Sequence, residues 1–341
     1  MITQRIAPDS RSWPAGGRPA RFGAVFVVVL AFSLIFGIPR TVQADPLRDA
    51  LDGLVMVIAD VPNDARTSDT LGSKRRGAGV AIDDDGLVVT IGYVILEADQ
   101  VRIMDRTGKV TPAEIVSYDH ETGFGLVRAL APIEATAVKL GHLADHEIGA
   151  VLYAAAPGEI AAVELMEKRP FAGGWEYLLE EAAFTSPPIR NFGGAALLDE
   201  SGLLVGIGSL IVPDAGHRPG NMFVPIELLP PILGDMLAFG RSTAAAPPWL
   251  GLYPDESRRG LVISRVARGG PADSVGISPG DRILAVGDDP VTDLENLWRR
   301  VRAYGPAGSN VPLRVFSRGA EREVMLTSRD RRGWLKLERS Y

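Results

Sequence analysis

The chain has 341 residues, of which 46% are hydrophobic and 23% charged, a composition typical of a globular protein with room for two or three cores. Its 36 Lys and Arg residues are outnumbered by 42 Asp and Glu, so the net charge is −6 and we expect no nucleic-acid partner. The absence of cysteine excludes disulfides, thiolate metal sites and a cysteine nucleophile. Four histidines, which we expect in solvated loops, remain for metal or acid–base chemistry: His120, His142, His146 and His217.

Residues 1–44 have the pattern of a signal peptide or membrane anchor. Residues 1–21 carry four arginines against one aspartate, and residues 22–38 are uncharged and largely apolar. The small-x-small sequence at 42–44 is typical of a signal-peptidase site, so we favour cleavage after Ala44. An uncleaved inner-membrane anchor is the alternative, because the apolar run approaches the roughly 20 residues of a spanning helix. Both outcomes place the folded part in the periplasm.

From residue 54 the sequence alternates short β-rich runs with turn signals, such as Asp-Asp-Asp-Gly at 83–86. Spacing of roughly 8–12 residues between these runs favours barrels or sandwiches. We predict two β units of similar size, over residues 45–137 and 138–239. The second unit closes with an apolar helical stretch near 226–239.

Residues 240–248 are small and proline-rich, which is typical of a linker. A third unit is predicted over residues 249–330, with several strands and a helix from 293 to about 304, and residues 331–341 form a C-terminal tail. Apolar residues at i, i+3 and i+7 give that helix one buried stripe: Leu294, Leu297 and Val301.

The third unit carries the most specific motif. Trp-Leu-Gly-Leu at 249–252, followed by GLVISRVARGGPADSVGISPGDRILAVGDDPVTDLENLWRRV, resembles the PDZ domain of HtrA/Deg-type periplasmic serine proteases. Backbone N–H groups of such a turn bind a peptide's C-terminal carboxylate while the peptide adds as a strand beside the helix. A side chain at Gly251 would crowd that carboxylate. The resemblance implies a peptide site made of Leu250, Gly251, Leu252, Leu297 and Val301, or else a PDZ fold used only for assembly.

The two β units resemble the trypsin-like double barrel that precedes the PDZ domain in this family, over roughly residues 50–237. Matching pieces include GAGVAIDDDGLVVTIGYVI at 77–95 and TSPPIRNFGGAALLDESGLLVGIGSLIV at 185–212. The resemblance implies a mainly β protein with two six-stranded antiparallel barrels followed by an α+β PDZ domain. It also implies trimers built through the barrels.

The positions of the family's catalytic base and its orienting carboxylate are changed. Where the family has Thr-Asn-x-His-Val, this chain reads Thr-Ile-Gly-Tyr-Val, so Tyr93 replaces the histidine. A phenol, with a reference pKa near 10, is mostly protonated at neutral pH and is a poor base. Where the family has Thr-Asp-Leu-Ala, this chain reads Thr-Gly-Phe-Gly, so Gly123 replaces the carboxylate and cannot orient a base.

The nucleophile position is changed as well. The family motif Pro-Gly-Asn-Ser-Gly-Gly-Pro-Leu matches a segment in which Phe192 stands in place of the serine. The approach to this position is two residues shorter, so the glycine that helps to form the oxyanion hole has no counterpart and Arg190 stands nearest. We therefore expect no catalytic residues at the triad positions.

An active HtrA-type endopeptidase with an unconventional catalytic site, serving protein quality control, is the alternative. Ser186 and Ser209 are the nearest serines, but neither has a histidine within the matching motif. His120 is the nearest candidate base, and it is offset from the position that the family uses.

We expect no metal and no cofactor. His142 and His146 have i, i+4 spacing, but two imidazoles without a third matched ligand are a weak zinc signal. The acidic run at 83–85 is better explained as a solvated turn than as a calcium site.

These observations predict an exported, HtrA-like pseudoprotease that acts as a peptide-binding or regulatory scaffold. Its expected partners are C-terminal tails or unfolded segments of envelope proteins. A homotrimer, or a mixed oligomer with a catalytically intact relative, is the expected assembly.

Overall fold

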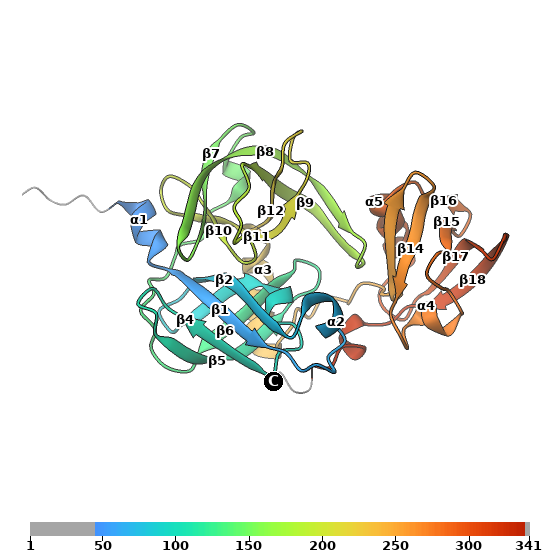
Figure 1. Cartoon of the computed structure of the whole chain (residues 1–341), viewed down its shortest axis with the longest axis horizontal. Helices are drawn as coiled ribbons and strands as arrows, with labels where there is room; N and C mark the ends of the chain where they lie inside the picture. Colours follow the sequence, from blue (N-terminus) through green and yellow to red (C-terminus); the bar gives the residue numbers. More distant parts are fainter. Residues whose placement is uncertain (1–44, 338–341) are drawn as a thin grey trace, which may run out of the picture. The chain divides into compact units, whose positions relative to one another are not determined.

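Two closed barrels of antiparallel strands follow one another along the chain, and a smaller mixed unit comes after them (Figure 1). A computed structural model describes residues 45–337. The predicted signal peptide or anchor at 1–44 lies outside the described residues, as do residues 338–341 of the predicted tail.

The first barrel has the strand order β1-β2-β3-β6-β5-β4. Apolar residues at alternate or successive positions of these strands fill its core, and β3 is buried along its whole length. Asp83 sets the β2–β3 turn, because its carboxylate accepts the backbone N–H groups of Asp85 at 3.0 Å and Leu87 at 2.7 Å. The elements of this part are α1 (Pro46–Leu51), β1 (Leu54–Asp60), α2 (Ser68–Leu71), β2 (Lys74–Ala81), β3 (Leu87–Ile91), the 3₁₀ turn η1 (Gly92–Val94), β4 (Gln100–Met104), β5 (Val110–Tyr118) and β6 (Phe124–Ala129).

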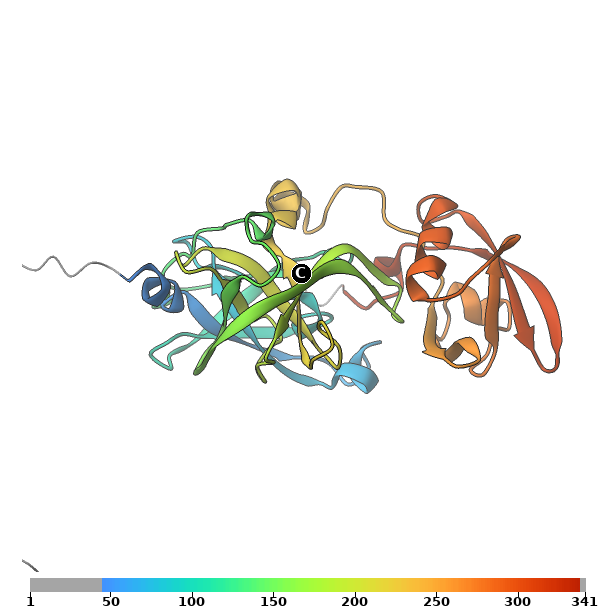
Figure 2. The same cartoon turned by 90° about the horizontal axis from the view of Figure 1, so that it is seen from above.

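The second barrel has the order β10-β11-β12-β9-β8-β7. Its strands are β7 (Val151–Ala156), β8 (Glu159–Gly173), β9 (Tyr177–Ser186), β10 (Ala196–Leu198), β11 (Leu204–Val212) and β12 (Gly220–Pro225). The long β8 and β9 form a hairpin whose tip is the three residues between them (Figure 2). The predicted helical stretch at 226–239 is divided into a 3₁₀ turn, η3 (Ile226–Leu228), and α3 (Pro230–Phe239), because a proline is favoured at the first position of a new helix.

The third unit is a sheet of order β13-β14-β15-β17-β18, with β16 paired to β15 and β13 at the edge. Its elements are β13 (Leu252–Ser257), β14 (Gly260–Val266), α4 (Pro271–Ser274), β15 (Arg282–Val286), β16 (Asp289–Pro290), α5 (Leu294–Ala303), β17 (Asn310–Ser317) and β18 (Ala320–Thr327). The side chain of Asp293 caps α5 by accepting the N–H of Asn296 at 2.7 Å. Of the predicted stripe on α5, Leu297 and Val301 are buried, together with Trp298.

The prediction of a mainly β fold, with two six-stranded antiparallel barrels followed by an α+β unit, is confirmed. After β18 the chain forms a 3₁₀ turn, η4 (Arg331–Gly333), and returns to the first barrel. There Leu335 and Leu337 are buried with Leu96 and Tyr118. Within residues 45–337, the helices are all too short or too polar to cross a membrane.

Candidate functional site

The three positions predicted to correspond to the catalytic triad lie close together in the structure. The backbone N–H of Gly92, next to Tyr93, donates to the carbonyl of Gly123 at 2.7 Å. The Tyr93 hydroxyl lies beside Gly193, the residue after Phe192, where an added Cβ would be 2.6 Å from the phenol oxygen. The two barrels therefore bring the replaced base, orienter and nucleophile positions to one place.

Tyr93 does not have the chemistry of a base here. Its hydroxyl donates a hydrogen bond to the carbonyl oxygen of Ser209 at 2.9 Å, so the proton is held by the second barrel. Burial raises the pKa of Tyr93 well above its ordinary value, because the charged phenolate would lose its hydration. The side chain remains a neutral donor at any pH at which the fold is expected to function.

The predicted positions of the orienting carboxylate and the nucleophile are held by Gly123 and Phe192, which are packed against neighbouring residues. Gly123 has φ +82°, a conformation that favours glycine, and an added Cβ would lie 3.4 Å from the hydroxyl of Tyr177. That hydroxyl donates to the carbonyl of Thr122 at 2.8 Å. Phe192 is half-buried and packs on the apolar core of the second barrel. Neither position offers a carboxylate or a hydroxyl.

Backbone donors near the predicted oxyanion position already have an acceptor. The carboxylate of Glu159 accepts the N–H groups of Arg190 at 3.1 Å and Asn191 at 3.0 Å. These hydrogen bonds hold the pKa of Glu159 below its usual value. A cavity of about 290 Å³ remains at this place, lined in part by Arg76, Tyr93 and Phe192. It has a mixed polar and apolar wall without a nucleophile–base pair.

Among the residues that the structure describes, neither alternative serine is hydrogen-bonded to a histidine. The hydroxyl of buried Ser186 donates to the carbonyl of Pro219 at 2.9 Å, and buried Ser209 accepts the Tyr93 bond through its backbone. His120 lies elsewhere, with its ring between the Tyr118 hydroxyl and the Arg331 guanidinium. The expectation of a solvated loop is therefore wrong for His120. Burial, together with the charge of Arg331, keeps its pKa well below 6.5.

The two histidines with i, i+4 spacing are separated by the 3₁₀ turn η2 (Leu143–Asp145), with His142 before it and His146 after it. His146 faces Asp199 at 3.8 Å instead. Among the residues that the structure describes, no group of three or more His, Asp or Glu side chains is arranged to hold a metal ion.

At the predicted peptide site, the described structure has an internal carboxylate. Glu176, at the tip of the β8–β9 hairpin, accepts the backbone N–H groups of Leu250 and Leu252, both at 2.7 Å. Glu176 is buried and has φ +63°. The indole N–H of Trp298 on α5 donates to the carbonyl of Gly173 at 2.9 Å, which attaches the hairpin to the helix beside the site.

The remaining predicted peptide-site residues form the wall around this carboxylate. Leu250, Leu252, Leu297 and Val301 belong to one apolar cluster, and the cluster also includes Leu178 from the hairpin. The structure thus brings all the sequence-predicted peptide-site residues to one place, with hairpin residues among them.

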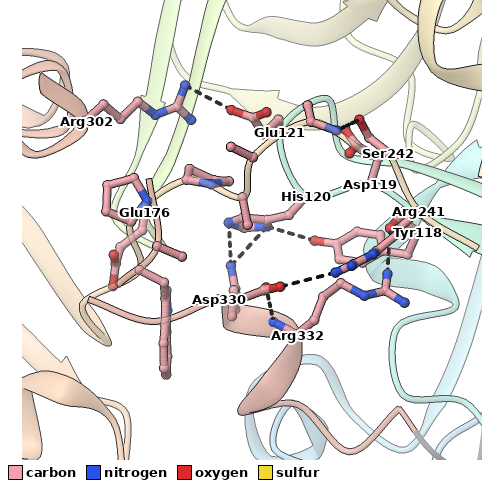
Figure 3. A pocket seen from close by; sticks show the side chains of 18 of the residues that line it. Tyr118, Asp119, His120, Glu121, Glu176, Arg241, Ser242, Arg302, Asp330 and Arg332 are labelled. Atoms are coloured by element: carbon pink, nitrogen blue, oxygen red, sulfur yellow. Dashed lines mark hydrogen bonds and ion pairs between the residues drawn. The ribbon is translucent and has the colours of Figure 1, made fainter. Parts of the chain in front are cut away.

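Glu176 also faces a cavity of about 360 Å³ (Figure 3). Burial raises the pKa of its carboxyl to about 7, against the opposing effect of the two N–H donors and of Arg331. Basic and aromatic side chains gather around this cavity, including Tyr118, His120, Arg241, Arg302, Arg331 and Arg332.

Glu159, Glu176 and Arg331 were missed by the sequence reasoning. No local signal in the sequence distinguishes the carboxylates of Glu159 and Glu176 from those of solvated turn residues. The Gly-Gly-Trp-Glu run at 173–176 indicates a tight turn, but it does not show what the glutamate contacts.

Comparison with known proteins agrees with this architecture. The model of the trypsin-like peptidase domain matches residues 77–207, and that of the PDZ domain matches residues 248–327. A DegP-like periplasmic serine endoprotease of Hahella chejuensis is 25% identical over 281 residues, which cover 73% of this chain and 55% of the relative. The serine endoprotease DegS of Haemophilus influenzae is 25% identical over 235 residues, which cover 64% of this chain and 66% of the relative.

The chain therefore spans between about half and two thirds of the length of these curated relatives. Among solved structures, the HtrA-type protease AlgW with a decapeptide is 20% identical, with a TM-score of 0.50, over 84% of this chain and 97% of that chain. This likeness concerns the fold alone.

The fold and the two matched domains define a trypsin-like peptidase domain joined to one PDZ domain. The chain is similar to HtrA-type proteases in both of these domains, and the curated relatives that it matches are named serine endoproteases.

Proposed function

We propose that this protein is a non-hydrolytic member of the HtrA-type family, which binds peptide tails through its PDZ domain and uses its double barrel as a scaffold. The hydrogen bond from Tyr93 to Ser209 carries the proposal, because it leaves a neutral phenol donor where a serine protease needs an imidazole acceptor. Gly123 and Phe192 supply neither orienter nor nucleophile.

Peptide binding is supported by the predicted PDZ site. The N–H groups of Leu250 and Leu252 converge on a carboxylate, as a PDZ domain requires for a C-terminus. AlgW, a protein of the same fold, has been solved with a decapeptide. We infer partners that present a C-terminal tail or an unfolded segment in the bacterial envelope.

A fluorophosphonate probe tests the loss of chemistry. The full-length protein is incubated with excess probe beside an active trypsin-like serine protease, and both intact masses are measured. We expect no added mass on this protein and one adduct on the control. An adduct on a single serine would overturn the proposal, favour the alternative of an active endopeptidase with an unconventional site, and identify its nucleophile.

We extend the proposal to the location of the protein in the cell and to its oligomeric state. Matched relatives are named periplasmic, which supports a periplasmic location for this chain. We propose that it forms a trimer, alone or mixed with a catalytically intact relative. Light scattering of the purified protein, alone and mixed with such a relative, tests this; monomers under both conditions would contradict it.

A further inference from the structure

The loop that should receive a peptide's C-terminal carboxylate already holds one from the same chain. One oxygen of Glu176 accepts the N–H of Leu250 and the other accepts the N–H of Leu252. A free C-terminus presents the same two oxygens on one carbon. The internal group therefore satisfies the donors that a client's tail would use.

The hairpin also occupies the space beside the loop. Leu178 is only 3% exposed and lies in the apolar cluster with Leu297 and Val301 of α5. On the other side, an added Cβ at Gly174 would be 2.4 Å from the carbonyl oxygen of Pro254 on β13. The hairpin tip thus contacts both the edge strand and the helix, between which a peptide would add as a further strand.

Aromatic side chains pack against one another at the hairpin tip. The rings of Trp175 and Tyr177 stack with centroids 5.9 Å apart, and Phe171 lies 5.9 Å from Trp175. An ion pair between Glu180 and Arg299, at 2.5 Å, adds a charged contact between the hairpin and α5. Both of its side chains are exposed, so it contributes little compared with the buried carboxylate.

We propose that the β8–β9 hairpin is a built-in occupant of the PDZ groove, with Glu176 in the place of a client's C-terminal carboxylate, so that a tail binds only by displacing the hairpin. This inference rests on the proposed peptide-binding function. Because the hairpin belongs to the same chain, it competes at a high effective concentration and lowers the apparent affinity for every tail. The preferred client ends in a free carboxylate with an apolar side chain near it, which would replace Leu178.

The test measures tail binding to the full-length protein and its variants. The probe is a pool of fluorescein-labelled octapeptides, randomised over the last four positions, with a free C-terminal carboxylate; the same pool ending in an amide is the control ligand. Glu176→Ala removes the internal carboxylate. Glu176→Gln keeps the side-chain size and replaces the alanine variant if the latter does not fold. Glu181→Ala is the matched control, because it removes the same charge from an exposed position of the same hairpin.

We expect the Glu176 variants to bind the carboxylate pool at least about tenfold more tightly than the wild type and the Glu181 variant, and the amide pool to bind none of them. Equal binding by the wild type and the Glu176 variants would overturn the internal occupant and leave the proposed function intact. If no folded variant binds the carboxylate pool, the peptide-binding function fails, and the inference fails with it. Exchange of the Leu250 and Leu252 amide protons, which should be slow in the wild type and faster in the Glu176 variants, verifies the contact independently.

Discussion

The hydroxyl of Tyr93 in the first barrel donates a hydrogen bond of 2.9 Å to the backbone carbonyl of Ser209 in the second. In a trypsin-like protease, the side chain at this position accepts a proton from the nucleophile. Here it donates one to the opposite barrel. The residue at the predicted position of the base thus joins the two barrels, and removal of its hydroxyl should affect stability.

Tyr93→Phe should lower the free energy of unfolding by about 1–2 kcal/mol, because the buried Ser209 carbonyl loses its donor while the ring keeps its packing. Urea titration of the wild type and the variant measures this difference. Tyr304→Phe, at an exposed ring, is the control and should change stability by less than about 0.5 kcal/mol. Equal stability of the wild type and Tyr93→Phe would contradict a stabilising role of the hydrogen bond between Tyr93 and Ser209.

Phe192→Ser should not create a protease. The variant would restore a hydroxyl, but Tyr93 and Gly123 would still supply neither base nor orienter, and Glu159 would still accept the N–H of Arg190. We expect no hydrolysis of fluorescently labelled casein above the wild-type level.

The same substitution should cost roughly 1–2 kcal/mol of stability, because Phe192 packs on the core of the second barrel. Phe239→Ser, at a ring that is 65% exposed, controls for the loss of an aromatic side chain. Measurable hydrolysis by Phe192→Ser would show that a working base exists.

Glu176 should make stability depend on pH. Its pKa is about 7 in the folded protein against an ordinary value of 4.5, so the folded state holds the proton more tightly. Its contribution to stability is therefore fully present below about pH 4.5 and is lost as the pH rises through 7, by up to about 3 kcal/mol. The stability advantage of the wild type over Glu176→Gln should shrink across this range.

Two neighbours of Glu176 are present in both proteins of that comparison. His120 has a lowered pKa, so its contribution to stability is lost as the pH falls below about 6.5. This pH dependence is opposite to that of Glu176. Arg331 is the same in both proteins. The contributions of His120 and Arg331 cancel when the free energies of unfolding of the wild type and Glu176→Gln are subtracted. Urea titrations of the two proteins at pH 4.5, 5.5, 6.5 and 7.5 therefore report on Glu176 alone. A difference in free energy that stays constant or grows with pH would contradict the raised pKa of Glu176.

Glu97→Gln should destabilise the protein by about 2–3 kcal/mol. The Glu97 carboxylate is 2% exposed and accepts the N–H groups of Arg66, Thr67 and Lys336 and the hydroxyl of Thr67. An amide turns one acceptor into a donor and leaves donors facing each other. Thermal and urea unfolding measure the change, and Glu134→Gln, at an exposed glutamate, serves as the control. A change of less than about 0.5 kcal/mol would contradict this role of Glu97.

Much of the fold could be predicted from the sequence because its signals are local. Alternating apolar runs and turn residues predicted the β units, and the spacing of Leu297 and Val301 predicted the buried face of α5. Tyr93, Gly123 and Phe192 could be named because each stands inside a segment that resembles a family motif, although the segment before Phe192 is two residues shorter. The residue types at those positions predict that the usual base, orienter and nucleophile are missing.

Contacts between distant segments required the tertiary structure. Glu176 and Leu250 are 74 residues apart, Tyr93 and Ser209 are 116 apart, and Glu159 and Arg190 are 31 apart. Each is a bond from a side chain to a backbone group, and such bonds leave no periodicity in the sequence. The sequence alone therefore determined that a PDZ-like unit follows the β units, and it predicts that the barrels lack the usual catalytic groups. Only the folded chain decided that the β8–β9 hairpin is long enough to place a carboxylate at the predicted peptide-binding loop of that unit, because this position depends on how the barrel and the PDZ domain pack.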